Sequence, residues 1–142
     1  MKPALLDTNV LLALAWPNHQ SHDAAHEWFR LQARHGWASC ALTQVGFIRL
    51  SSNPAYTRLA VTPPQAATLL RELLAHKKHS FWPSPAGDSP ALYQRALGHQ
   101  QVNDAYLVEV AKRHKGRLVT LDTKLAVHAE DEGQVWVIGA ER

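Results

Sequence analysis

The sequence predicts an α/β fold with a mostly parallel central sheet and helices on both faces. Short apolar runs typical of strands alternate with amphipathic segments along the whole chain. The chain has 142 residues, which is the usual length of one domain, and it contains no internal repeat. We therefore expect a single α/β domain that spans residues 1–142.

The first part of the chain is expected to contain two strands and three helices. Pro17 ends the first helix because proline lacks the amide hydrogen that a helix interior needs, and Gly36 ends the second. Thr43 is expected to cap the third helix, whose apolar residues recur at helical spacing before Pro54. In order, these elements are a strand at 3–6, a helix at 9–15, a helix from 21 or 23 to 34, a strand at 37–42 and a helix from 43 that ends before 54.

The second part of the chain begins with the clearest helical pattern, at residues 62–76. Thr62 is expected as its N-cap, two prolines occupy its first turn, and its leucines form one apolar stripe. Residues 83–90 are rich in Pro, Gly and Ser and are expected to form a loop. The other expected elements are a strand at 80–83, a helix at 104–114, a strand at 117–121, a short helix at 124–128 and a strand at 135–138.

The composition is that of a soluble globular protein, with 46% hydrophobic and 19% charged residues. No apolar run reaches the roughly 18 to 20 residues that a membrane-spanning helix requires, and the run at 4–16 does not resemble a signal peptide, so a cytoplasmic location is expected. The single cysteine, Cys40, has no partner for an internal disulfide and is expected to be a small buried residue.

The charge is unevenly distributed along the chain. The net charge is +3, and no acidic residue occurs between Glu27 and Glu72, although that stretch carries several arginines. Such a surface favours a polyanion such as RNA, because each neutralised phosphate releases counterions. Arginines that only keep helix faces soluble would produce the same pattern, and charge alone leaves both interpretations open.

Three aspartates lie where a strand or a loop passes into a helix. Asp7 and Asp122 follow apolar strand-like runs, and Asp104 opens an amphipathic helix. Each one alone is compatible with helix capping. Together they form the oxygen ligand set that binds a hard cation such as Mg2+ or Mn2+, and parallel sheets place ligands beyond the carboxyl ends of their strands. We therefore predict that the three carboxylates converge in one metal site.

Several polar residues near these acids are candidates for supporting roles. Thr120 precedes Asp122 by two residues on a strand, so its hydroxyl is expected to orient the carboxylate or a metal-bound water, and Thr120 is also a candidate for substrate binding. Asn9 lies beside Asp7 and is a candidate for contact with the acids or the substrate. Arg49 is a candidate for binding a substrate phosphate, and an internal ion pair is the competing interpretation.

Four segments of the chain resemble the PIN-domain ribonucleases of the VapC toxin type. They are LLDTNVLLAL, LTQVGFIRLSSNP, GHQQVNDAYL and RLVTLDTKL, in the family's order and over nearly the whole chain. The resemblance implies a PIN-like three-layer fold and metal-dependent hydrolysis of RNA phosphodiester bonds by a toxin of a toxin–antitoxin pair. It also implies a metal pocket formed by Asp7, Asp104 and Asp122, a small cognate antitoxin as partner, and a homodimer.

One position departs from the family pattern. Gln44 stands where the family usually carries glutamate, so the expected site has three carboxylates in place of four. An amide brings no negative charge, so metal affinity should be lower, and Gln44 is expected to orient an outer water molecule. Two interpretations follow: an active nuclease, or a catalytically weakened or silent RNA-binding or regulatory module.

Two other hydrolase classes have sequence features that partly occur in this chain. His22 and His26 are four residues apart on an expected helix, a spacing that also occurs in zinc hydrolases. The usual glutamate of those enzymes is absent between them, and nine histidines make such a spacing common by chance. A phosphatase with an aspartate nucleophile would need a second aspartate where Asn9 stands.

Overall fold

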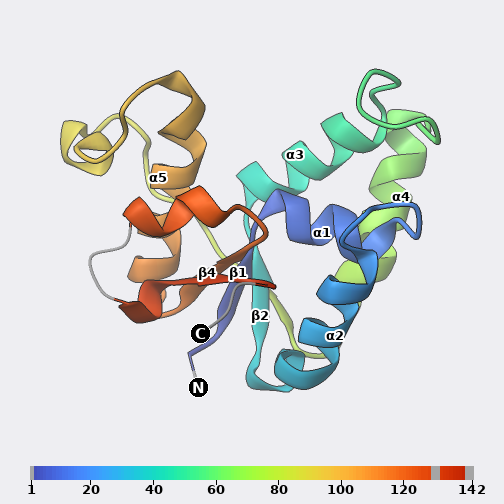
Figure 1. Cartoon of the computed structure of the whole chain (residues 1–142), viewed down its shortest axis with the longest axis horizontal. Helices are drawn as coiled ribbons and strands as arrows, with labels where there is room; N and C mark the ends of the chain where they lie inside the picture. Colours follow the sequence, from blue (N-terminus) through green and yellow to red (C-terminus); the bar gives the residue numbers. More distant parts are fainter. Residues whose placement is uncertain (1, 129–131, 140–142) are drawn as a thin grey trace.

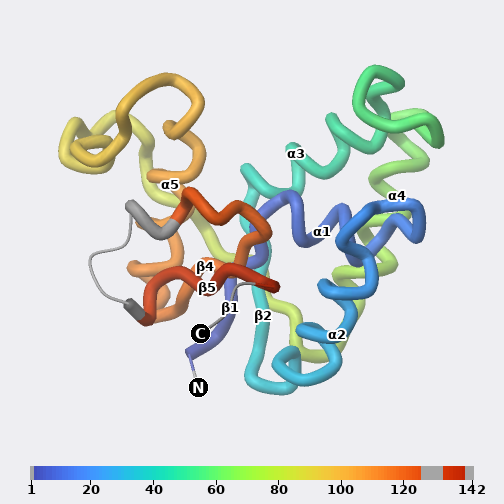
Figure 2. The backbone as a smooth tube through the Cα atoms, viewed as in Figure 1, coloured from blue at the N-terminus to red at the C-terminus, as the bar shows by residue number. Residues whose placement is uncertain are grey.

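The structure, a computed structural model, describes residues 2–128 and 132–139. Its centre is a five-stranded sheet in the order β3-β2-β1-β4-β5, and every neighbouring pair is parallel. Figure 2 shows β1 between β2 and β4. The strands are β1 (Ala4–Leu6), β2 (Trp37–Ser39), β3 (His79–Phe81), β4 (Arg117–Thr120) and β5 (Val135–Val137).

Helices cover both faces of this sheet, as Figure 1 shows for α5 on one side of the strands and α1 and α2 on the other. The α-helices are α1 (Thr8–Ala15), α2 (His22–Gln32), α3 (Ala41–Ser51), α4 (Pro63–Leu74) and α5 (Val102–Arg113). Short 3-10 helices are η1 (Ala33–His35), η2 (Pro90–Tyr93), η3 (His99–Gln101), η4 (Thr123–His128) and η5 (Glu132–Gln134). No helix in the described residues has the length and apolar character needed to cross a membrane.

Successive side chains of a strand point to opposite faces of the sheet, so the interior is divided into two apolar cores. Ala4 and Leu6 of β1 belong to the core that contains residues of α1 and α2, whereas Leu5 belongs to the core that contains residues of α5. This division follows from strand geometry, since successive side chains point to opposite faces of a sheet. The predicted three-layer α/β architecture is confirmed.

Most expected elements are present, and the differences lie at their ends. The strand expected at 37–42 ends at Ser39, because Cys40 is the N-cap of α3. Thr43 is therefore not the cap, although its hydroxyl accepts a hydrogen bond from the Cys40 amide at 3.1 Å. Thr62 caps α4 as predicted, through reciprocal hydrogen bonds with Gln65.

The helix expected at 104–114 begins earlier, at Val102. Asp104 is consequently its third residue, inside the first turn, and Gln101 is the N-cap. A carboxylate in the first turn interacts favourably with the helix dipole without being the cap. The 3-10 turn η3 leads directly into this helix, and the sequence pattern did not indicate it.

The central pair of strands determines where a ligand site can form. The strands β1 and β4 are adjacent, with Leu6 opposite Val119, although many residues separate them in the sequence. On one side of β1 the sheet continues with β2 and β3, and on the other with β4 and β5. Such a change of direction opens a crevice beyond the carboxyl ends of the two strands. Asp7 and Asp122 follow these two ends.

Candidate active site

Asp7 is held in a fixed orientation where β1 passes into α1. Its side chain is only 8% exposed, and one carboxylate oxygen accepts a hydrogen bond from the Thr8 amide at 2.7 Å. The other oxygen accepts a hydrogen bond from the Thr120 hydroxyl at 2.7 Å. The first bond caps the helix, and the second joins the ends of β1 and β4.

Thr120 is the centre of a small network of hydrogen bonds at the end of β4. Its side chain is fully buried, and its hydroxyl accepts hydrogen bonds from the Asp122 amide at 3.0 Å and from Asn9 Nδ2 at 3.3 Å. Asn9 Oδ1 in turn accepts a hydrogen bond from the Leu121 amide at 3.2 Å. Asn9 and Thr120 therefore position the two strand ends and the Asp7 carboxylate.

The three aspartates influence one another electrostatically. Burial raises the pKa of Asp7 from 3.8 to about 6, and the negative charges of Asp104 and Asp122 add to the increase. Burial, with the charge of Asp122, also raises the pKa of Asp104. Hydrogen bonds from Thr120 and Thr8 oppose the increase at Asp7, because they favour the ionised form. Folding has thus brought like charges from three distant parts of the chain into one environment.

No described ion pair neutralises this negative charge. The ion pairs in the described part of the chain join Arg30 to Glu27 and Arg113 to Glu109, on helix surfaces. The side chain of Asp122 accepts a hydrogen bond from the Lys124 amide at 2.9 Å. An added cation would relieve the repulsion among the aspartates.

The donor atoms of the site suit a hard divalent cation. All three acidic side chains offer carboxylate oxygens, the ligands that Mg2+ and Mn2+ prefer. Within residues 2–128 and 132–139, however, no three acidic, histidine or cysteine side chains form a ready-made metal cage. Mg2+ commonly binds through one or two carboxylates together with water and substrate phosphate, so the open arrangement fits this ion.

A pocket of about 230 Å³ lies directly beside Asp7. Asp104 and the exposed Arg49 also line it, whereas Asp122 is not part of its lining. Leu42, Val45, Leu50 and Leu107 give part of the wall an apolar character. An anionic substrate group in this pocket would lie near Arg49, Asp7 and Asp104.

Gly46 allows α3 to approach the start of α1 at this pocket. A Cβ atom at position 46 would lie 2.9 Å from Thr8 Oγ1 and 3.2 Å from Thr8 Cγ2. Both residues line the pocket, and neither was singled out from the sequence. A glycine inside an otherwise regular apolar helix was the available signal for such a close approach.

Gln44 is not directed at the aspartates. Its Nε2 donates a hydrogen bond to Ser39 Oγ at 3.0 Å, and Ser39 Oγ lies 2.8 Å from His79 Nε2. Gln44 is also absent from the described lining of the pocket beside Asp7. The structure places the Gln44 amide nitrogen against Ser39, and a role for Gln44 in orienting a water molecule at the metal site stays a prediction.

His22 and His26 have a structural role at the end of α1. His22 Nδ1 lies 2.7 Å from the Ala13 carbonyl oxygen, and His26 Nε2 lies 2.8 Å from that of Leu14. These carbonyls belong to the last turn of α1, where the regular helix leaves acceptors unpaired. One ring nitrogen of each histidine is thus engaged by a backbone carbonyl oxygen, which accounts for the pair without a metal.

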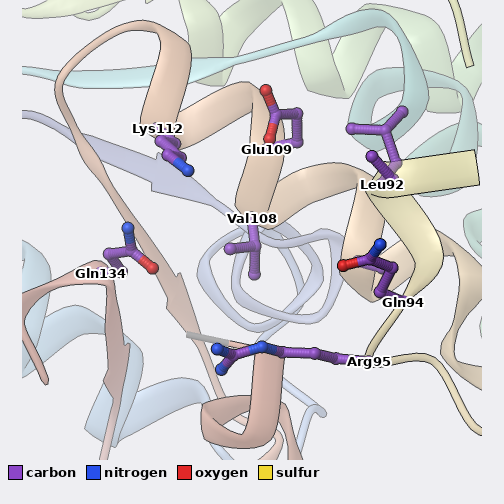
Figure 3. A pocket seen from close by; sticks show the side chains of 9 residues that line it. Leu92, Gln94, Arg95, Val108, Glu109, Lys112 and Gln134 are labelled. Atoms are coloured by element: carbon purple, nitrogen blue, oxygen red, sulfur yellow. The ribbon is translucent and has the colours of Figure 1, made fainter. Parts of the chain in front are cut away.

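A second, smaller pocket of about 80 Å³ lies beside α5 and does not include the three aspartates. Glu109 and Lys112 of α5 line it together with Arg95 and Gln134, and Figure 3 shows Arg95 extending past Val108. Among the described residues, this pocket shares no lining residue with the pocket beside Asp7.

Comparisons with known proteins agree with this geometry. The family model of the PIN domain matches residues 4–131. The chain belongs to the PIN domain family. Ribonuclease VapC39 of Mycobacterium tuberculosis is 41% identical over 130 residues, which cover 87% of this chain and 91% of that protein. This PIN domain is therefore of the VapC type.

Solved structures support the same fold for this PIN domain. PAE2754 from Pyrobaculum aerophilum matches with a TM-score of 0.62 and 24% identity, covering 94% of this chain and 83% of that one. VapBC2 from Rickettsia felis, solved bound to a DNA fragment from its promoter, matches with a TM-score of 0.57 and 18% identity, covering 86% and 89%. At these identities the likeness concerns the fold.

Proposed function

We propose that this PIN domain is a metal-dependent endoribonuclease that acts as the toxin of a toxin–antitoxin pair. The observation that carries the proposal is that Asp7 and Asp104 line one pocket beyond the central strands, where burial, with the charges of Asp104 and Asp122, raises the pKa of Asp7. Its VapC-type relatives, named ribonucleases, support the choice of RNA as substrate.

The three aspartates are the proposed ligands of Mg2+ or Mn2+. When bound, such a cation supplies Lewis-acid chemistry for hydrolysis of a phosphodiester bond. Thr120 holds one oxygen of Asp7 and favours its ionised form, which is the form that binds a cation. Asn9 Nδ2 donates a hydrogen bond to the Thr120 hydroxyl. In this proposal both residues position the Asp7 carboxylate.

Arg49 is the proposed contact for the substrate phosphate. It lines the pocket beside Asp7 and Asp104 and is exposed to solvent, so an incoming strand can reach it. A guanidinium group binds phosphate oxygens through paired hydrogen bonds.

We further propose a cognate antitoxin protein as partner, a homodimeric state and action in the cytoplasm, where RNA is available. The VapC-type relatives and the likeness to the VapBC2 structure support the first of these. A silent RNA-binding module is the second candidate function, because Gln44 brings no carboxylate. Gln44 donates a hydrogen bond to Ser39 and adds no carboxylate. The proposed acidic residues are therefore the same three aspartates for both candidate functions.

The proposal is tested by RNA cleavage with the purified chain. Cleavage of single-stranded RNA is expected with Mg2+ or Mn2+, and loss of cleavage is expected with EDTA or with Asp7→Asn. Asp23→Asn, which changes an exposed carboxylate on α2, is the matched control and should cleave normally. RNA binding without cleavage under all these conditions would support the silent module, and cleavage that persists in EDTA would exclude the metal site.

A further inference from the structure

The pocket beside Asp7 and Asp104 is called the acidic pocket here. A larger pocket of about 480 Å³ adjoins it, and the lining of this larger pocket is mainly apolar. It lies between α3 and the segment that includes η2 and the start of α5. The residues that define it here as the apolar pocket are Leu42, Val45, Tyr93, Val102, Asn103 and Tyr106. Val45 is 63% exposed and Val102 is 41% exposed, so the pocket presents apolar side chains to solvent.

The apolar pocket is continuous with the acidic pocket. Leu42, Val45 and Asn103 line both of them. A ligand with an anionic part and an apolar part could therefore occupy both pockets at once. Asn103 lies at the junction, and its amide offers both a hydrogen-bond donor and an acceptor.

The aromatic side of the apolar pocket is held in place by the loop at 83–90. The Tyr93 hydroxyl donates a hydrogen bond to the Gly87 carbonyl, and the Tyr106 hydroxyl donates one to the Pro85 carbonyl. These bonds engage the polar ends of both side chains. The rings are thus oriented before any ligand binds, which reduces the entropy lost on binding.

We propose that the apolar pocket binds one unpaired nucleobase next to the phosphate that is cleaved, an inference that rests on the proposed function. A nucleotide joins a charged phosphate to a flat, largely apolar base, which matches the order of the two pockets. Aromatic side chains bind unstacked bases by stacking, whereas bases inside a duplex are not available for it.

The position of the apolar pocket favours a nucleobase over a protein side chain. The pocket lined by Asp7 and Asp104 shares Leu42, Val45 and Asn103 with the apolar pocket, so an occupant lies next to the proposed phosphate site, and Asn103 offers it an amide suited to a base edge. An antitoxin side chain and a second copy of the chain are the alternative occupants, and the experiment below separates them.

The first measurement is binding by the native chain in EDTA, which prevents metal-dependent cleavage. A fluorescently labelled single-stranded RNA is compared with versions in which one nucleotide at a time is abasic. Removal of the base at one position is expected to weaken binding at least about fivefold, because the lost stacking cannot be replaced. Equal binding of every abasic version would overturn the inference.

The second measurement uses Val102→Ser, since Val102 lines the apolar pocket and not the acidic one. This variant should weaken binding of the intact RNA roughly threefold to tenfold and leave binding of the sensitive abasic RNA unchanged. Leu31→Ser on α2 removes a similarly exposed apolar side chain and should bind as the native chain does. Equal weakening of both RNAs by Val102→Ser would contradict a base pocket.

The remaining outcomes separate this inference from the proposed function. Base-dependent binding without cleavage in Mg2+ or Mn2+ would sustain the pocket and refute the nuclease. Cleavage of RNA together with equal binding of every abasic version would sustain the nuclease and refute the base pocket. If Val102→Ser changed only antitoxin binding or only self-association, the pocket would belong to a protein interface and the inference would be wrong.

Discussion

The hydroxyl of Thr120 donates a hydrogen bond to the carboxylate of Asp7, with 2.7 Å between the two oxygens. This bond connects the end of β4 to the end of β1 inside the protein, across 113 positions of sequence. The same hydroxyl accepts hydrogen bonds from the Asp122 amide and from Asn9. One side chain thereby positions an acid directly and supports the backbone of another.

Replacement of Thr120 by valine tests this arrangement. Thr120→Val keeps the shape but leaves the Asp122 amide and Asn9 Nδ2 without their acceptor, so the free energy of unfolding should fall by about 1 to 3 kcal/mol. Cleavage should also fall, because Asp7 loses its donor. Chemical denaturation and RNA cleavage measure the two effects. Thr120→Ser retains the hydroxyl and should retain most activity, and native behaviour of Thr120→Val would show that the bond is dispensable.

The buried Asp7 predicts an unusual dependence of stability on pH in the absence of metal. Its pKa is about 6 in the folded chain and 3.8 in the reference state, so the folded state binds this proton more tightly. The contribution of Asp7 to stability is therefore fully present below the reference pKa. It is lost as pH rises through the folded pKa, and the total is on the order of 3 kcal/mol.

The measurement is the difference in unfolding free energy between the native chain and Asp7→Asn, in EDTA, from about pH 4 to pH 7. The native chain should lose stability relative to Asp7→Asn across this range. A flat difference for Asp7→Asn would mean that Asp7 is ionised at no cost in the folded chain.

Mg2+ is expected to stabilise the folded chain, and more strongly at neutral pH than at pH 5. The carboxylates must lose their protons to bind a cation, so protons compete with the metal below the raised pKa of Asp7. At a concentration 100 times the dissociation constant, a bound ion adds about 2.7 kcal/mol. Thermal unfolding with MgCl2 measures the effect, and Asp104→Asn should reduce it. An equal effect of KCl at the same ionic strength would indicate general screening.

Gly46→Ala is expected to destabilise the chain by about 1 to 3 kcal/mol and to reduce cleavage. The new methyl group would lie 2.9 Å from Thr8 Oγ1, so the Thr8 side chain beside Asp7 or the helix α3 must shift. The double variant Gly46→Ala with Thr8→Ala removes the obstructing atoms and should recover part of the stability. Gly98→Ala is the control, because nothing lies within 4 Å of its added Cβ. Denaturation midpoints of the four chains decide the question.

Gln44→Glu is expected to act on His79 and not on metal binding. Gln44 donates to Ser39 Oγ, which leaves that hydroxyl free to donate to His79 Nε2 and suits a neutral ring. Burial lowers the pKa of His79 in the native chain, and a glutamate at position 44 would draw the Ser39 proton to itself. The pKa of His79, followed by NMR, should rise. Tighter Mg2+ binding or faster cleavage in this variant would instead place residue 44 at the metal site.

Local patterns identified the main elements of the fold. The N-cap at Thr62 and the loop at 83–90 depend on residues close together in sequence, and the structure confirms both. The ends of β2 and α5 were misplaced, because the Cys40 cap and the turn η3 depend on contacts that propensity does not encode. The resemblance to PIN domains was visible in four segments, since that information is carried by residue identity.

The sequence alone determined the α/β class, the family and the three aspartates that are candidate metal ligands. The alternation of strands and helices, the helix caps and the family motifs are all properties of residues that are close together in sequence. Only the tertiary structure decided that Thr120 bonds to Asp7, that Gln44 turns toward Ser39, and that an apolar pocket adjoins the acids. These relations join residues from different strands and helices. They depend on the order of strands in the sheet and on close packing between helices, which no local pattern specifies.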